Sequence, residues 1–291
     1  MNLAVFKISS IRGWLQNAKN SFLILLRLIK FHCPFTLIRY QALVFLAHIF
    51  IYPIIRLTLG KVKAGIICTS VLGARSPLIF SLPSPHKSKI VMHQIDPGLY
   101  YEIYINDIYP QDLIKEGMRV IDVGANIGAY TILAAEKVGK NGKVIAIEPE
   151  PQNYKQLLEN IELNNFQNVI PKNIALTDHE GFTKLSLSPY PGKHTILFEK
   201  DKVGSIEVPI KTLDNLLEEL NLNKVDIIKI DAEGAEMPIL KGAEKTLKVN
   251  PNIKIIVAAE HYKSQIKEVV KFLNEKGFKT DILKDNIVIT I

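Results

Sequence analysis

The stretch Val120–Thr131, VIDVGANIGAYT, decides the fold that the sequence predicts. An apolar strand runs into Asp122, Gly124 follows, and Gly128 stands four residues further on, where a helix is expected to begin. Small residues at such a turn let the backbone approach a ligand, and open α/β sheets bind ligands outside the carboxyl ends of their strands. The spacing is not the G-x-G-x-x-G of dinucleotide-binding folds, and no Gly-Lys-Ser/Thr of a phosphate-cradling loop is present. A ligand site is therefore expected here, whereas a nicotinamide enzyme and a P-loop enzyme are disfavoured.

Strand-like and helix-like segments alternate from Arg119 onward, which is typical of a parallel sheet with helices on both faces. The last two strands are joined by the short link LKD, which leaves no room for a crossover helix, so they must be antiparallel. The predicted fold is α/β, with a mostly parallel sheet of seven strands whose last strand is antiparallel. The expected strands are RVIDVG (119–124), KVIAIE (143–148), NVIPKNIAL (168–176), VDIIKIDA (225–232), NIKIIVAAEHY (252–262), FKTDIL (278–283) and NIVITI (286–291), with helices near 127–138, 150–164, 212–220, 236–248 and 264–276.

Two segments fall outside this alternation. Residues 182–210 hold two β-like runs around the sequence PYPGKHT, so we expect a hairpin or flap over one edge of the sheet. Residues 66–117 begin with the short β-like runs GIICTS, PLIFSL and KIVMHQI, which predict a small antiparallel cap. We therefore expect a basic, apolar helical region (1–65), a cap or lead-in segment (66–117) and a main domain (118–291).

Composition supports a large folded domain. The chain has 291 residues, of which 47% are hydrophobic, enough for one large α/β domain plus an extension. Its two cysteines, Cys33 and Cys68, show no metal-ligand spacing, so neither a structural zinc site nor a disulfide is expected. Residues 1–95 contain twelve Lys or Arg and no acid, which leaves 36−12 = 24 basic and 29 acidic groups in the remainder. The two regions therefore have different surroundings.

The N-terminal region alternates apolar and basic segments. Its longest charge-free run, Tyr40–Ile55, has 16 residues, whereas a membrane-spanning helix needs about 20. Arg27 and Lys30 interrupt the first apolar run, which argues against a secretory signal. This pattern suits the headgroup boundary of an anionic membrane, and the alternative is a helical subdomain packed on the main domain. We expect a cytoplasmic protein with peripheral membrane contact at the inner face; single-pass anchoring stays open, and a nucleic-acid partner is disfavoured.

A second acid, Glu148, ends the next strand, 24 positions after Gly124. An acid there is placed to accept hydrogen bonds from two ribose hydroxyls. The alternative is a carboxylate that caps the helix starting after Pro149 and Pro151. Because Asp122, at the end of the first strand, suits a ligand with an ammonium group, such as the methionine part of S-adenosylmethionine, the ribose role is favoured.

Together these residues resemble S-adenosylmethionine-dependent methyltransferases, and over roughly residues 96–291 the chain resembles the FkbM-type family. The matching phrases are EIYINDIY, VIDVGANIGAYT, IAIEPEPQNYKQLLENIELN, NIALTDHEG, VDIIKIDAEGAE and IIVAAEH. The resemblance implies a Rossmann-like class I methyltransferase fold, S-adenosylmethionine as methyl donor and usually O-methylation of a hydroxyl on a sugar or small natural product. It also implies the cofactor contacts: Asp122, Gly124, Ala125, Asn126 and Gly128 on the methionine side, Glu148 at the ribose, and Asn173 and Ala175, within Asn173–Leu176, near the adenine.

The stretch VDIIKIDAEGAE (225–236) places charges at the end of a core strand. Lys229 and Asp231 are two apart and so share a face, with Glu233 just past the strand, while Glu260 and His261 finish the neighbouring strand. We expect these five side chains in one cleft. The hypothesis is that His261 or Asp231 is the general base for an acceptor hydroxyl, with Lys229 and Glu233 tuning the charge and binding acceptor hydroxyls.

Other interpretations of this cluster stay open. A divalent ion held by Asp231, Glu233 and Glu260 is one, with a role in activating the hydroxyl. An ion-paired network at the sheet edge is another, in which Glu236 only complements the N-terminus of the following helix.

The sequence thus predicts an O-methyltransferase for a hydroxyl of a sugar, glycan or lipid-linked saccharide. RNA or protein methylation ranks lower, because the chain lacks an Asn/Asp-Pro-Pro-aromatic motif and a catalytic cysteine near the site. The third interpretation is a non-catalytic methyltransferase-like membrane scaffold, against which the intact glycine motif and Glu148 argue. Further candidates for acceptor contact, each with ordinary packing or solvation as the alternative, are Glu102, Tyr109 and His194.

Overall fold

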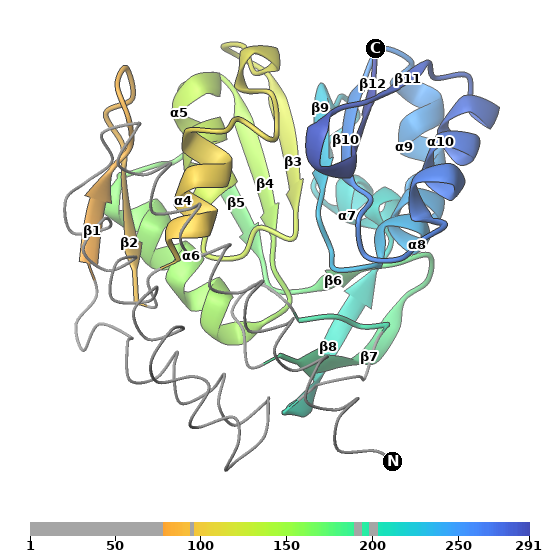
Figure 1. The fold of residues 1–291 in the computed structure, drawn as a ribbon, viewed down its shortest axis with the longest axis horizontal. Coiled ribbons are helices and arrows are strands. Elements are labelled where there is room, and N and C mark those ends of the chain that lie inside the picture. The colour runs from red at the N-terminus through yellow and green to blue at the C-terminus, as the bar shows by residue number, and fades with distance from the viewer. Residues whose placement is uncertain (1–77, 94–95, 189–193, 198–202) are drawn as a thin grey trace, which may run out of the picture. The chain divides into compact units, whose positions relative to one another are not determined.

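The computed structural model describes residues 78–93, 96–188, 194–197 and 203–291 (Figure 1). The chain divides into two units, residues 1–83 with 92–106 and residues 84–91 with 107–291. The described part of the first unit holds β1 (Leu78–Ser81) and α4 (Pro97–Tyr104), and β2 (Lys89–Met92) ends at the unit boundary. α4 begins where the Asp96 carboxylate accepts a hydrogen bond from Leu99 N at 3.1 Å. The predicted β-like run GIICTS lies outside the described residues.

The second unit is built on the predicted seven-stranded sheet. Its order is β11-β12-β10-β9-β3-β4-β5, and every neighbouring pair from β10 to β5 is parallel. β12 is antiparallel to both β10 and β11, so the last strand of the chain lies inside the sheet rather than at its edge. The strands are β3 (Arg119–Val123), β4 (Lys143–Ile147), β5 (Val169–Lys172), β9 (Ile227–Ile230), β10 (Lys254–Ala258), β11 (Thr280–Ile282) and β12 (Ile287–Thr290).

The order of the strands reverses between β3 and β9. The chain runs from β3 outward through β4 to β5, and later from β9 outward through β10 to the far edge. Ligands of open α/β sheets bind at such a reversal, outside the carboxyl ends of the strands. The β3-to-α5 turn and the residues that follow β9 both lie there, which is where the sequence predicts the site.

Helices cover the sheet, with α5 and α6 beside β3 to β5 and α8 to α10 beside β9 to β12 (Figure 1). The main core joins fully buried strand residues such as Ile121 and Ile228 to the apolar side of the helices, including Leu216 and Leu273. Each fully buried side chain of this kind contributes about 1.5–3 kcal/mol. The helices are α5 (Ala129–Val138), α6 (Pro151–Leu163), α7 (Leu213–Glu219), α8 (Glu236–Lys241), α9 (Glu244–Val249) and α10 (Gln265–Glu275), with short 3₁₀ turns at Gln111–Leu113 and Lys284–Asn286.

Three predicted elements differ from the structure. The strand expected over 168–176 is two strands in different sheets, β5 and β6 (Ala175–Leu176), because the chain turns at Asn173. The helix expected over 236–248 is divided into α8 and α9 at Gly242, a poor helix former. The strand expected over 252–262 ends at Ala258, so Glu260 and His261 lie in the loop after it.

The hairpin predicted within 182–210 is confirmed. β7 (Gly181–Leu187) and β8 (Gly204–Lys211) are antiparallel, and β6 adds to β8 in parallel, so that the three form a separate sheet. Its own small core contains Leu185, Val208 and Ile210. Between the two strands, Thr195 forms a bridge with Ser186.

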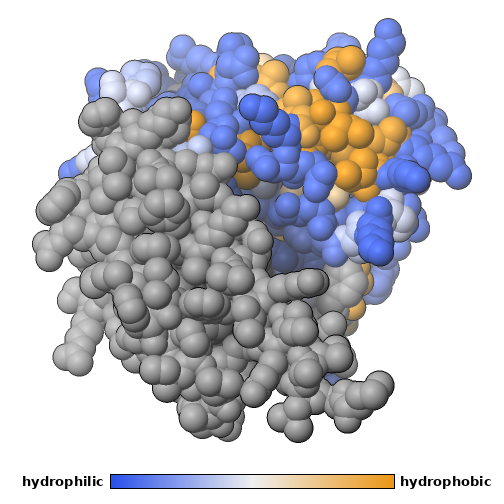
Figure 2. All heavy atoms as spheres, in the orientation of Figure 1, coloured by the Kyte–Doolittle hydropathy of each residue, from blue (hydrophilic) through white to orange (hydrophobic). Residues whose placement is uncertain are grey.

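The surface of the described residues in view is mostly hydrophilic, and its broadest apolar area lies over the region where Figure 1 draws β10 to β12 (Figure 2). Within the described residues, none of the helices combines the length and the apolar character that a bilayer-crossing span requires. Residues 1–65, on which the membrane prediction rests, lie outside them.

Candidate active site

The turn after β3 is in close contact with the ends of the two neighbouring strands, β4 and β9. Gly124 has φ +74°, and a Cβ added there would lie 1.8 Å from the backbone oxygen of Asp231, so no larger residue fits. Gly124 N and Ala125 N each donate to Ile147 O at 3.0 Å. Gly128, with φ +92°, then begins α5. The turn that sequence analysis singled out is therefore rigid and lies directly beside the end of β9.

A buried ion pair lies beneath this turn. Asp122, with no exposed surface, lies 3.0 Å from Lys229 Nζ through Oδ1 and accepts from Thr131 Oγ1 at 2.6 Å through Oδ2. Lys229, itself 3% exposed, also donates to Gly124 O at 2.9 Å and to Val123 O at 3.3 Å. Burial alone would lower the pKa of Lys229, but Asp122 and then Asp231 raise it above its ordinary value. Asp122 and Lys229 therefore form an ion pair, and the hydrogen bonds that Lys229 donates to Val123 O and Gly124 O hold the turn in place.

These contacts change the roles expected for the pair. The ammonium group of Lys229 is committed to Asp122 and to two carbonyls of the turn, so it does not face an acceptor as predicted. Asp122 is likewise held by Lys229 and Thr131, which favours support of the turn over direct contact with the methionine part of a donor.

Glu148 stands at the end of β4, buried against the same turn. Its Oε2 accepts from Asn126 N at 2.8 Å and its Oε1 from Glu150 N at 2.9 Å. Burial, the largest influence, raises the pKa of Glu148 to about 7. The helix cap that was the alternative role belongs instead to Glu150, whose carboxylate accepts from Asn153 N at 2.6 Å.

The two residues expected near the adenine lie past the end of β5. Asn173 Nδ2 donates to Glu148 O at 2.8 Å and to Pro149 O at 3.0 Å, so it holds the backbone that carries Glu148. Ala175 is buried in β6 and packs in the small core of the three-stranded sheet.

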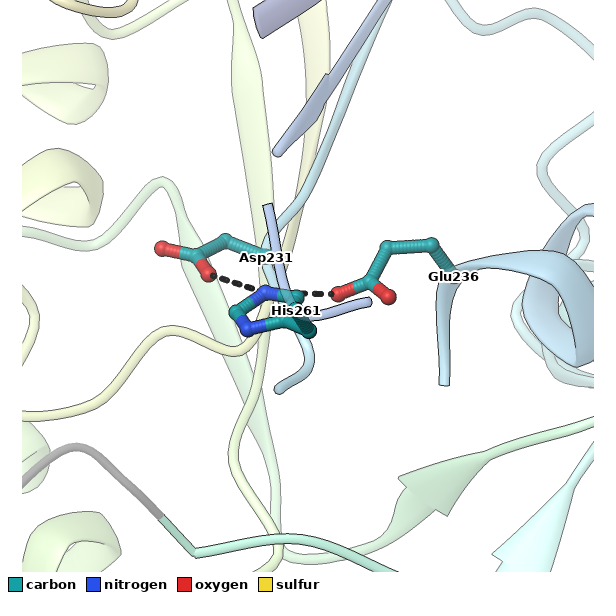
Figure 3. Close-up of side chains that lie close together, drawn as sticks. All are labelled: Asp231, Glu236 and His261. Atoms are coloured by element: carbon teal, nitrogen blue, oxygen red, sulfur yellow. Dashed lines mark ion pairs between the residues drawn. The ribbon is translucent and has the colours of Figure 1, made fainter. Parts of the chain in front are cut away.

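Beyond β9 and β10, three carboxylates surround one imidazole, as Figure 3 shows for two of them. His261 Nε2 lies 3.3 Å from Glu236 Oε1 and 3.9 Å from Asp231 Oδ1, and Nδ1 lies 3.5 Å from Glu233 Oε2. Burial lowers the pKa of His261, but Glu236, Glu233 and Asp231 outweigh burial and raise it to about 9. An imidazole that is already protonated cannot accept a proton, so this arrangement favours Asp231 over His261 as a base.

Glu236 and Gln265 belong to this cluster, although sequence analysis gave Glu236 only a helix-terminal role and did not select Gln265. Glu236 has no exposed surface, and its Oε1 accepts from Ala232 N at 2.9 Å and Gly234 N at 3.2 Å. Gln265 donates to Glu236 Oε2 through its amide and accepts from His261 N at 2.8 Å. The acid at the start of a helix was a visible signal, whereas nothing in the sequence joins Gln265 to the site.

Of the outlying candidates, Tyr109 is in the site. It is buried, and its hydroxyl donates to Asp231 Oδ2 at 2.7 Å. Glu260 is exposed and lies outside the group of Asp231, Glu236 and His261 side chains whose polar atoms converge. His194 Nδ1 accepts from Ser188 N at 3.0 Å on the hairpin, while Glu102 is an exposed residue of α4 in the first unit.

Thr195, between the two strands of the hairpin, contacts the cluster. Thr195 Oγ1 donates to Glu233 O at 2.7 Å. Glu233 has φ +50°, a left-handed conformation that is uncommon for a residue with a side chain. This hydrogen bond helps to keep Glu233 in the conformation that turns its carboxylate toward His261.

Comparison with known proteins shows that the chain is similar to methyltransferases. The model of the methyltransferase FkbM domain matches residues 122–280, 159 of the 291 residues. Hexuronic acid methyltransferase AglP of Haloferax volcanii is 30% identical over 167 residues, 57% of this chain and 65% of that protein. Methyltransferase 1 of Beauveria bassiana is 26% identical over 166 residues, 50% of this chain and 66% of that protein, so the chain spans slightly under two thirds of these relatives. Among solved structures, a methyltransferase from Aquifex aeolicus has TM-score 0.41 and 18% identity, covering 66% of this chain and 91% of that one.

Proposed function

The chain belongs to the FkbM family of S-adenosylmethionine-dependent methyltransferases, and from this membership we propose that it methylates a hydroxyl of a sugar, glycan or lipid-linked saccharide. The observation that carries the proposal is the group of carboxylates at the switch point of the sheet. Asp231, with its side chain 33% exposed, stands directly after β9, and its backbone oxygen lies against Gly124, at the start of the turn that would hold the donor. The curated hexuronic acid methyltransferase, at 30% identity, supports a saccharide acceptor.

The donor site follows from the turn and its support. The backbone from Gly124 through Ala125 and Asn126 to Gly128 is proposed to hold the methionine part of the donor, and Glu148 its ribose. Asn173 positions the backbone of Glu148, and the pair of Asp122 and Lys229 keeps the turn in place. The donor supplies both the methyl group and its own leaving group.

The acceptor side has to orient a hydroxyl and take up its proton. Asp231 Oδ2 is fixed by Tyr109, so the carboxylate stands in one orientation with part of its surface open. When bound, the donor would supply the methyl group, and the partly exposed carboxylate of Asp231 or of Glu233 would take up the hydroxyl proton. Orientation and proton removal together are what an unactivated hydroxyl requires.

Donor binding is expected to weaken in mild acid because the pKa of Glu148 is about 7. A carboxyl group with this pKa is about 90% ionised at pH 8 and about 10% ionised at pH 6, and only the ionised form accepts from both ribose hydroxyls. The affinity for S-adenosylmethionine, measured by calorimetry, should therefore be about tenfold lower at pH 6 than at pH 8. In Glu148→Gln the affinity for S-adenosylmethionine should be low at both pH values. An equal wild-type affinity at pH 6 and pH 8 would contradict the proposed contact between Glu148 and the ribose.

The acceptor class is tested with methyl-labelled donor and separate glycan, lipid-linked saccharide, RNA and protein fractions. We expect the label as an O-methyl group on a saccharide. Label confined to RNA or protein would overturn the proposal in favour of those acceptors, and donor binding without transfer to any fraction would favour a non-catalytic scaffold.

A peripheral location at the inner face of the membrane is proposed on the basic, apolar sequence of residues 1–65 alone. The full-length chain should float with vesicles that contain anionic lipid and not with neutral vesicles. Equal behaviour with the two kinds of vesicle would contradict this location.

A further inference from the structure

Three potential metal ligands converge from three segments of the chain (Figure 3). They are Asp231 after β9, Glu236 at the start of α8 and His261 after β10, and one ligand atom from each lies within 4.8 Å of the others. His261 Nε2 is 3.3 Å from Glu236 Oε1 and 3.9 Å from Asp231 Oδ1. Nitrogen and oxygen ligands stand about 2.0–2.2 Å from a bound transition metal, so two of them are separated by about 3–4 Å. The spacing suits a single ion.

The orientation of the imidazole is a separate observation. The side chain of His261 is only 10% exposed, and Nε2 is a buried atom without a hydrogen-bond partner in the described part of the chain. Nε2 points toward the other two ligands, while Nδ1 faces Glu233 Oε2 at 3.5 Å. Metal-bound histidines usually direct their second ring nitrogen to a carboxylate in this way.

Both carboxylate ligands are also held by hydrogen bonds. Tyr109 donates to Asp231 Oδ2, which leaves Oδ1 on the side of His261. Gln265 donates to Glu236 Oε2, and two backbone N–H groups donate to Oε1. Such outer contacts fix the direction of ligands before an ion binds.

The charges of the cluster do not balance without a further cation. Asp231, Glu233 and Glu236 contribute −3, and His261 must be neutral to bind an ion, so one divalent cation would reduce the charge of the cluster to −1. The nearest buried lysine, Lys229, is paired with Asp122. Because a buried charge without compensation costs several kcal/mol, a divalent cation would stabilise this arrangement.

We propose that Asp231, Glu236 and His261 bind one divalent transition-metal ion, such as Mn²⁺ or Zn²⁺. A ligand set of one imidazole nitrogen and two carboxylates suits these ions better than Mg²⁺ or Ca²⁺, which prefer oxygen alone. The metal ligands predicted from the sequence were Asp231, Glu233 and Glu260, and only Asp231 belongs to this site. Glu233 lies beside Nδ1 of His261, away from the ligand atom Nε2, and Glu260 is exposed. The role of the ion rests on the proposed function: in the open positions it would hold the acceptor hydroxyl oxygen and make its proton easier to remove.

The test is calorimetric titration of the full-length, chelator-treated protein with Mn²⁺ and, separately, with Zn²⁺. We expect one ion per chain, and an affinity at least about tenfold lower in His261→Ala and Glu236→Gln. Glu260→Gln and the surface control Glu275→Gln, which lies on the exposed side of α10, should bind as the wild type does. Glu236 is fully buried, so Glu236→Gln can fail to fold. In that case the result for His261→Ala decides the test, because the side chain of His261 is partly exposed.

Two outcomes would overturn the site: no binding of either ion at a 1:1 ratio by the folded protein, or unchanged affinity in His261→Ala. Donor binding and methyl transfer measured on the same samples separate this site from the proposed function. Transfer that persists in a chelator, with no ion bound, would overturn the role of the ion in the reaction and leave the proposed function standing. Ion binding without transfer to any hydroxyl would leave the metal site standing and contradict the proposed function.

Discussion

Replacing Asp231 by Asn is expected to lower kcat for methyl transfer by about 10²–10⁴-fold while the affinity for S-adenosylmethionine stays nearly unchanged. Asparagine has the size of aspartate, and its amide oxygen can still accept the hydrogen bond that Tyr109 donates to Oδ2. It is neutral, however, so it neither takes up a proton nor serves as an anionic ligand. The carboxylate of Asp231 faces His261 and Tyr109, whereas Lys229, paired with Asp122, holds the donor turn, which is why donor binding should survive.

The matched control for this substitution is Asp281→Asn. Asp281 is an exposed residue of β11, at the far edge of the sheet, and its substitution should leave both kcat and donor affinity as in the wild type. Wild-type turnover in Asp231→Asn would remove Asp231 from the reaction. An equal loss of donor binding would show instead that the substitution damages the turn at Gly124.

Replacing Lys229 by Met is expected to lower the free energy of unfolding by about 3–5 kcal/mol, measured by urea denaturation. Asp122 has no exposed surface, so without Lys229 its charge keeps only the hydrogen bond from Thr131. The turn would also lose the hydrogen bonds that Lys229 donates to Val123 O and Gly124 O. Removal of one partner of a buried ion pair is much more costly than removal of both, because it leaves the other charge uncompensated.

Two further variants identify the cause of this loss. The double substitution Asp122→Asn with Lys229→Met should recover much of the lost stability, since neither position then carries an uncompensated charge. Lys271→Met should change stability little, because Lys271 is 77% exposed in its pair with Glu275. If Lys229→Met were as stable as the wild type, the ion pair could not be what supports the donor turn.

The sequence predicted the parts of the fold that depend on local patterns. The β3-to-α5 turn, the acid at the end of β4 and the antiparallel final strand follow from spacing and from the length of one link, and the structure has all three. The insertion of β12 between β10 and β11 does not follow from them, because it depends on which strand edges pair across the sheet.

The location of the site was predicted correctly from the sequence, but the predicted contacts of several of its residues were wrong. Lys229 was expected to face the acceptor with Asp231, but the register of β3 and β9 places Asp122 directly opposite Lys229, and strand register cannot be read from a single strand. Glu260 was expected in the cleft because β10 was taken to continue to Tyr262, whereas it ends at Ala258. Tyr109 was already a candidate for acceptor contact, and the structure places it on Asp231. Gln265 was not selected, because its contacts with His261 and Glu236 depend on the tertiary fold.

The most direct test of the account is titration of the folded full-length protein at pH 8 with S-adenosylmethionine, followed for the wild type, Glu148→Gln and Asp231→Asn. We expect 1:1 binding by the wild type and by Asp231→Asn, and much weaker binding by Glu148→Gln, because, of these two residues, Glu148 contacts the donor and Asp231 does not. Absence of binding by folded wild-type protein, or undiminished binding by Glu148→Gln, would contradict it.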